Sequence, residues 1–197
     1  MINKWNYQPP SQDVLNQRNK LVSEMGLNPV IALLLVQRGL TTAQEVKRFF
    51  RPSLSNLHDP FLMPDMEKAV QRLNKALGDK ERILIYGDYD VDGTTAVSLV
   101  YKYLRPYSTN LDYYIPDRYD EGYGISLRSI QYAEEHGITL VIALDCGIKA
   151  IEKIAYAKER GIDFIICDHH MPDDELPDAV AVLDPKRADS NYPYEHL

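Results

Sequence analysis

An apolar run that leads directly into an acidic turn decides the fold of this chain. Residues 82–93 read RILIYGDYDVDG, in which three aspartates occupy alternate positions before the final glycine. A short, nearly continuous apolar run is typical of a strand that is covered on both faces of its sheet. A helical pattern follows over residues 94–104. The segment therefore predicts a strand, a polar turn and a helix in that order.

The same rhythm continues to the end of the chain. Further short apolar runs predict strands at residues 111–115, 139–144, 163–167 and 179–183, and helical patterns lie between them at 127–136 and 149–160. Strands that alternate with helices of this length favour parallel pairing with helices on both faces. We therefore expect an α/β fold with a doubly wound, mostly parallel sheet.

Residues 1–80 have a different, helical pattern. Helices are predicted at 12–25, 29–38, 43–50 and 66–77. Their boundaries rest on three signals: the Asn28-Pro29 start, the Thr42 to Glu45 capping box, and Asp65 as the expected N-cap of the fourth helix. We expect a helical N-terminal region over residues 1–80 and a separate α/β domain over 81–197.

The composition is that of an ordinary soluble globular protein, with 45% hydrophobic and 26% charged residues. No apolar run approaches the ~18 residues of a membrane span, and the first residues lack an apolar signal core. The two cysteines, Cys146 and Cys167, do not have the spacing of a zinc site. We expect both thiols to be packed as small apolar groups in a cytoplasmic protein that does not contact a membrane.

The net charge of −7 is unevenly distributed along the chain. Residues 1–82 hold 12 basic and 8 acidic side chains, whereas residues 83–197 hold 10 basic and 21 acidic ones. An acidic half can repel phosphates, or it can bind cations that attract them. The placement of the acidic residues decides between these possibilities.

Acidic residues follow four of the predicted strands, at the point where each strand ends. The turns contain Asp88, Asp90 and Asp92, then Asp117-Arg118, then Asp145, and finally Asp168-His169-His170. The carboxyl ends of parallel strands share one edge, which is where open α/β sheets bind ligands. Unpaired carboxylates at that density would raise each other's pKa, and a divalent cation would remove the conflict.

Carboxylates with one or two imidazoles favour Mn²⁺ or Mg²⁺, and two such ions about 3.5–4 Å apart suit phosphoester hydrolysis. Each motif also has a structural alternative. The Asp-x-Asp-x-Asp-Gly turn is not an EF-hand, because Leu99 stands where that loop needs glutamate. It could simply be a turn with a helix N-cap, and Arg118 could form an ordinary surface ion pair.

In this order and spacing, the motifs at residues 85–93, 116–124, 145–147 and 168–170 resemble those of the DHH phosphoesterase superfamily. Within it, the chain is similar to the bacterial 5′→3′ exonucleases that are specific for single-stranded DNA. The helical leader shares this resemblance at residues 38–42, 49–52 and 59–61. The resemblance covers nearly the whole chain.

The resemblance implies hydrolysis of single-stranded DNA to 5′-mononucleotides, in DNA repair and recombination. It implies Mn²⁺ or Mg²⁺, with two ions in the complete protein, and makes a helicase and a single-strand-binding protein candidate partners. The implied metal ligands are Asp88, Asp90, Asp92, Asp145 and His169. His170 would contact the scissile phosphate, Arg118 would bind a DNA phosphate, and Asp168 would orient the imidazoles. The implied catalytic set is Asp90, Asp92, Asp145, His169 and His170.

Family members continue into a fourth motif with a further metal-binding aspartate, and Asp184-Pro185 is a poor match to it. We therefore expect an N-terminal part of a longer protein, incomplete at the C-terminal end of its DHH domain, with reduced or no activity alone.

Two alternatives stay open. Another DHH phosphoesterase would cleave oligonucleotides, cyclic dinucleotides or pyrophosphate, although Tyr86 stands where a pyrophosphatase would place histidine. A non-catalytic scaffold with a decayed site is the second, although all five implied catalytic residues are present.

Overall fold

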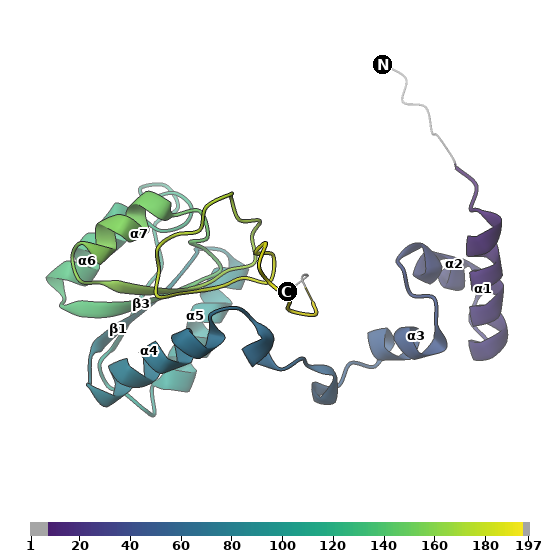
Figure 1. Cartoon of the computed structure of the whole chain (residues 1–197), viewed down its shortest axis with the longest axis horizontal. Coiled ribbons are helices and arrows are strands. Elements are labelled where there is room, and N and C mark those ends of the chain that lie inside the picture. Colours follow the sequence, from purple (N-terminus) through teal and green to yellow (C-terminus); the bar gives the residue numbers. More distant parts are fainter. Residues whose placement is uncertain (1–7, 195–197) are drawn as a thin grey trace, which may run out of the picture. The chain divides into compact units, whose positions relative to one another are not determined.

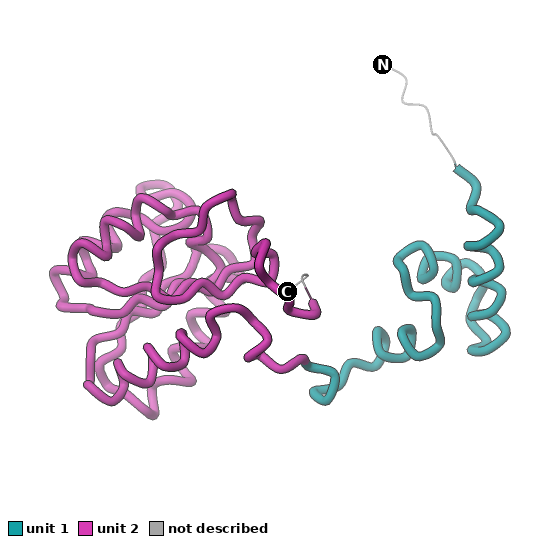
Figure 2. The backbone as a smooth tube through the Cα atoms, viewed as in Figure 1, with its two compact units in different colours: residues 1–57 teal, residues 58–197 magenta. Residues whose placement is uncertain are grey.

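The computed structural model describes residues 8–194, and the chain forms two compact units that divide after Leu57 (Figure 2). The first unit contains three helices and a short turn. These are α1 (Gln12–Met25), α2 (Pro29–Gln37), α3 (Ala43–Phe50) and the 3₁₀ turn η1 (Leu54–Asn56). The predicted helices of this part of the chain are thus confirmed.

Local capping and a small apolar core explain the first unit. The predicted capping box is present, because the Thr42 hydroxyl accepts from the Glu45 N–H while the Glu45 carboxylate accepts from the Thr42 N–H. Helix α1 ends at Gly26, whose φ of 66° is a left-handed conformation. The core between the helices consists of Leu21, Ala32, Leu35, Val36 and Val46.

The second unit is built on a five-stranded sheet in the order β2-β1-β3-β4-β5, in which every neighbouring pair is parallel (Figure 1). The doubly wound α/β prediction is therefore confirmed. The elements are η2 (Pro60–Leu62), α4 (Met66–Gly78), β1 (Arg82–Gly87), α5 (Val91–Leu104), β2 (Leu111–Tyr114), α6 (Leu127–Glu135), β3 (Ile138–Leu144), α7 (Ile151–Lys158), β4 (Asp163–Cys167) and β5 (Ala181–Leu183).

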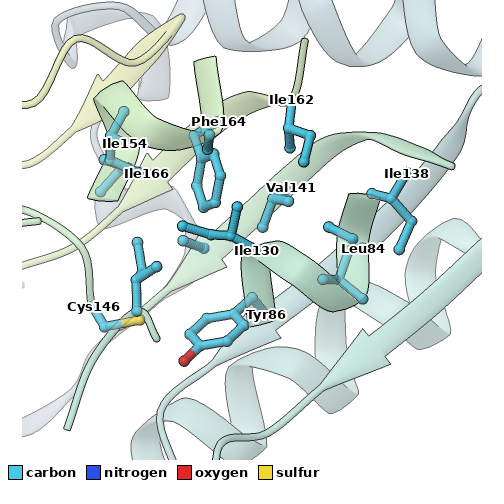
Figure 3. Close-up of a cluster of buried hydrophobic side chains, with 14 of the residues drawn as sticks. Leu84, Tyr86, Ile130, Ile138, Val141, Cys146, Ile154, Ile162, Phe164 and Ile166 are labelled. Atoms are coloured by element: carbon cyan, nitrogen blue, oxygen red, sulfur yellow. The ribbon is translucent and has the colours of Figure 1, made fainter. Parts of the chain in front are cut away.

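Both faces of the sheet are buried, as its apolar strands predicted. Helices α6 and α7 cover one face, where Leu84, Val141 and Phe164 meet Ile130 and Ile154 (Figure 3). Helices α4 and α5 cover the other face. There the alternate strand residues Ile83, Ile85, Leu140, Ile142 and Ile165 are buried with Ala69, Ala76, Val97 and Leu104. Two-sided burial explains why the strands lack a polar alternation.

Helix α4 belongs with the sheet and not with the N-terminal helices. Its buried residues Ala69 and Ala76 lie in the core cluster of the second unit. The compact units therefore divide after Leu57, while the domain boundary expected after residue 80 stays a prediction. The physical reason is that the apolar side of α4 is needed to cover β5 and its neighbours.

Asp65 precedes α4 as predicted, but its expected capping role is wrong. Its side chain makes no cap hydrogen bond, and its backbone has a left-handed φ of 61°. The carboxylate instead lies 2.6 Å from Arg187 Nη1 and 2.6 Å from Lys68 Nζ. Because the largely buried Arg187 follows β5, this pair joins the start of α4 to the end of the sheet.

Both cysteines are free thiols, and Cys146 is buried in the core beside α6 and α7 as expected, whereas Cys167 is only partly buried. Among residues 8–194, no helix combines the length and the apolar character that a membrane crossing requires.

An ion-pair network stabilises the amino-terminal edge of the sheet. The Arg72 guanidinium on α4 contacts Glu81 Oε2 at 2.7 Å and Asp163 Oδ2 at 2.6 Å. The Thr139 hydroxyl also donates to Glu81. Burial alone would raise the pKa of Glu81, but the hydrogen bonds from Arg72 and Thr139 outweigh it and lower that pKa. The network ties α4 to the starts of β1, β3 and β4.

The first prediction concerns the close approach of two backbone segments. A Cβ on Gly93 would lie 2.6 Å from the backbone nitrogen of Asp88, and relieving this clash would require a costly shift of the backbone. We expect Gly93→Ala to lower the free energy of unfolding by about 1–3 kcal/mol, as overpacking does. The matched control is Gly78→Ala, where a Cβ meets no atom within 4 Å. Urea unfolding should show a normal or higher midpoint for the control, and equal midpoints would contradict the prediction.

The second prediction concerns pH. Because the pKa of Glu81 is lower in the folded chain than its ordinary 4.5, its contribution is complete above about pH 4.5 and disappears as the pH falls through the folded value. We expect Glu81→Gln to lower the free energy of unfolding by about 1–3 kcal/mol at pH 7 and by much less near pH 3. Urea unfolding at both pH values measures this, with the exposed Glu152→Gln as control. A cost that is the same at both pH values would argue against the network.

Candidate metal centre

The register of the sheet aligns four aspartates along its carboxyl edge. Gly87 pairs with Leu144, Leu144 with Cys167, and Cys167 with Leu183. The residue after each of these strand ends is an aspartate, namely Asp88, Asp145, Asp168 and Asp184. The predicted convergence of carboxylates at one edge is therefore a direct result of parallel pairing.

Asp145, His169 and His170 form the tightest cluster at this edge. Their potential ligand atoms all lie within 4.8 Å of one another, and Asp145 Oδ1 is 3.1 Å from His169 Nε2. Asp145 has a left-handed φ of 60°, which is uncommon for a residue with a side chain and is often found at functional sites. The cluster offers one carboxylate and two imidazoles, which is a donor set that suits a divalent cation.

Asp168 orients the two histidines through hydrogen bonds to their backbone and to the His170 ring. Its buried carboxylate accepts hydrogen bonds from the backbone N–H groups of Ile148, His169 and His170, and lies 2.6 Å from His170 Nδ1. Burial alone would raise the pKa of Asp168, but these hydrogen bonds outweigh it and lower that pKa. A carboxylate only accepts, so the His170 proton is assigned to Nδ1.

Two buried carboxylate oxygens at this edge, Asp88 Oδ2 and Asp184 Oδ2, have no hydrogen-bond partner within the described part of the chain. Asp88 is 1% exposed and Asp184 0% exposed. Burial raises the pKa of both groups, and also that of Asp145, whose negative neighbour Asp90 raises it further. A hard cation would provide the missing partner for a buried carboxylate oxygen beside imidazoles. The residues present therefore fit Mn²⁺ or Mg²⁺.

Asp90 and Asp92 lie near the cluster but not in it. Asp90 Oδ1 accepts from the N–H groups of Asp92 and Gly93, so it caps α5 as the structural alternative suggested. Asp92 lines a cavity of about 470 Å³ together with Asp145 and His169. Their assignment as metal ligands stays a prediction.

Aromatic side chains extend from the cluster toward Arg118. The exposed Arg118 guanidinium lies 5.2 Å from the centre of the Tyr89 ring, and the Tyr89 and Tyr123 rings meet edge to face at 6.4 Å. The Tyr123 hydroxyl reaches His170. Burial and the carboxylates of Asp168, Asp88 and Asp145 raise the pKa of Tyr123, so its phenol is neutral at pH 7. These contacts connect Arg118 with His170 through two tyrosine rings, and the role of Arg118 stays a prediction.

Sequence reasoning missed two features of this edge. In the sequence, Asp184 is only a poor match to a later motif, although its place directly after β5 is the same signal that identifies Asp145. The contact between Tyr123 and His170 joins residues 47 positions apart, and no local sequence pattern predicts it.

The chain is similar to single-stranded-DNA-specific exonucleases over most of its length. It is 40% identical to RecJ of Bacillus subtilis over 98% of the chain, and 34% identical to RecJ of Escherichia coli over 87%. It spans only 24% and 29% of the lengths of these relatives. The predicted resemblance to this branch of exonucleases is confirmed.

Solved structures extend the comparison. The crystal structure of an exonuclease RecJ bound to manganese covers 68% of this chain at 27% identity with a TM-score of 0.61, and the chain covers 34% of that protein. The structure of RecJ from Thermus thermophilus in complex with Mn²⁺ covers 93% of this chain with a TM-score of 0.68, and this chain covers 25% of that protein. At 24% identity, this likeness supports the fold alone. Residues 82–191 match the model of the DHH family, N-terminal domain, and the chain belongs to the DHH family.

Proposed function

We propose that this chain carries the metal-binding part of a 5′→3′ exonuclease that hydrolyses single-stranded DNA to 5′-mononucleotides in DNA repair and recombination. Its relatives of similar sequence are named as single-stranded-DNA-specific exonucleases, and one solved relative is bound to manganese. The proposal assigns residues 81–197 to the DHH domain and residues 1–80 to a helical N-terminal region. The family match begins at residue 82, which supports this start.

The observation that carries the proposal is the cluster of Asp145, His169 and His170 at the carboxyl edge, beside the orphaned carboxylate of Asp88. The cofactor is Mn²⁺ or Mg²⁺, with Asp145 and His169 as ligands joined by Asp88, Asp90 and Asp92. When bound, such ions supply an activated water and neutralise charge on the phosphodiester.

The residues of the chain perform the remaining tasks. His170, which Asp168 holds through Nδ1, would contact the scissile phosphate at this edge. Arg118 binds a second phosphate electrostatically, in line with its exposed position over Tyr89. Single-stranded DNA is the proposed partner, a helicase and a single-strand-binding protein are candidate further partners, and the proposed location is the cytoplasm.

The third prediction tests the enzyme. In the whole protein that carries this chain, we expect Asp145→Asn to reduce Mn²⁺-dependent release of 5′-mononucleotides at least about 100-fold, since a central anionic ligand is lost. The matched control is Asp178→Asn, which removes an exposed carboxylate paired with Lys158. Products are measured from 5′- and 3′-labelled single strands.

The same assay separates the alternatives. Duplex DNA, a dinucleotide, a cyclic dinucleotide and pyrophosphate are offered in parallel. Degradation of single strands from the 5′ end agrees with the proposal. Cleavage of only a small substrate would replace it with another DHH phosphoesterase, and a fully active Asp145→Asn variant would refute the metal assignment.

The fourth prediction concerns Asp168, which supports the site without belonging to the cluster. We expect Asp168→Asn to weaken Mn²⁺ binding about 10- to 100-fold, because partners that orient metal-binding histidines have effects of this size. Isothermal titration calorimetry on the 197-residue chain measures it, with Asp178→Asn as control. Circular dichroism checks that the variant is folded, and unchanged affinity in a folded variant would show that Asp168 does not orient the ligands.

A further inference from the structure

The loop that contains Tyr123 is fastened to the end of β1. Gly122 and Gly124 have left-handed φ values of 77° and 76°, which a glycine adopts easily. The Gly124 carbonyl accepts a 2.6 Å hydrogen bond from the buried Tyr86 hydroxyl, and its N–H donates to Asp88 Oδ1 at 3.4 Å. The backbone directly after Tyr123 is therefore held at Gly124 by one residue of the sheet and one of the acidic turn.

This anchoring brings the Tyr123 hydroxyl to the His170 ring. The hydroxyl oxygen is 3.2 Å from His170 Nε2 and 3.4 Å from Nδ1, and the two rings meet edge to face at 5.9 Å. Because Nδ1 is directed to Asp168, Nε2, at 3.2 Å, is the ring nitrogen left to accept from the Tyr123 hydroxyl. Asp168 and Tyr123 therefore hold one imidazole between them.

We propose that Tyr123 is a positioning residue, whose hydroxyl fixes the orientation of His170 for the scissile phosphodiester. This inference rests on the proposed function and adds to it a residue outside the implied metal and phosphate ligands. An imidazole that is held at one nitrogen only can turn about its side-chain bonds, whereas a second hydrogen bond restricts that rotation. Orientation of this kind acts on the chemical step more than on DNA affinity.

Stacking on a base is the alternative role for the same ring, since it is 54% exposed and meets Tyr89, the ring that Arg118 contacts. The two roles need different atoms. Stacking needs the ring alone, whereas positioning needs the hydroxyl that contacts His170. Tyr123→Phe removes only the hydroxyl, and Tyr123→Leu removes the ring as well, so the pair of variants separates them.

The fifth prediction is that Tyr123→Phe lowers kcat about 10- to 100-fold in the whole protein with little change in KM, measured on single-stranded DNA with Mn²⁺. Tyr119→Phe is the matched control, because Tyr119 lies four residues away in the same segment and is 93% exposed. We expect the control to match the wild type. Normal kcat in Tyr123→Phe with a raised KM in Tyr123→Leu would overturn positioning in favour of stacking.

A spectroscopic measurement tests the contact without activity. In the metal-free 197-residue chain, ¹⁵N chemical shifts of the His170 ring report which nitrogen carries the proton and which one accepts. We expect Tyr123→Phe to shift Nε2 and Tyr119→Phe to leave it unchanged. Identical His170 shifts in all three proteins would overturn the inference. Should the wild type degrade no DNA, the proposed function fails while this measurement still decides whether Tyr123 holds His170.

Discussion

The buried carboxylate of Asp168 connects the apolar sheet to its polar edge. It accepts from three backbone N–H groups and from His170 Nδ1, and so joins the end of β4 to the loop that follows β3. A buried charge is tolerated only when its hydrogen-bonding capacity is filled. Those donors therefore fix both loops, and with them the positions of His169 and His170. The positions of the two histidines therefore depend on this one group.

The buried carboxylates at the carboxyl edge of the sheet are electrostatically unfavourable when no cation is bound. Asp88, Asp145 and Asp184 all have raised pKa values because they are buried, and Asp90 adds repulsion to two of them. The fold tolerates this because its stabilising contacts lie elsewhere, in the two-sided apolar core and in the Arg72 network at the opposite edge. A divalent cation would convert the same repulsion into binding, so the instability of the edge and its proposed chemistry have one origin.

Local patterns were sufficient for the secondary structure, because periodicity and caps act over a few residues. The helix predicted at 149–160 is α7 over Ile151–Lys158, and the strand predicted at 163–167 is β4 without change. Local signals failed where a distant part of the chain competes for a residue. Asp65 has the pattern of an N-cap, but its carboxylate pairs with Arg187, far along the sequence. Helix α4 follows the N-terminal helices in the sequence, and only the packing shows that its apolar side covers the sheet.

The position of the acidic turns at the carboxyl ends of parallel strands could be predicted from the sequence, because apolar runs and their order along the chain specify that arrangement. Which side chains meet there depends on the packing of the folded chain. In the folded chain, Asp145, His169 and His170 form the cluster, and Asp184 lies at the same edge. Asp90 caps α5, and the Tyr123 hydroxyl contacts His170. The reason is that strand order and register set which turns are neighbours, while backbone conformation at Asp145 and the glycines beside Tyr123 sets where each side chain lies.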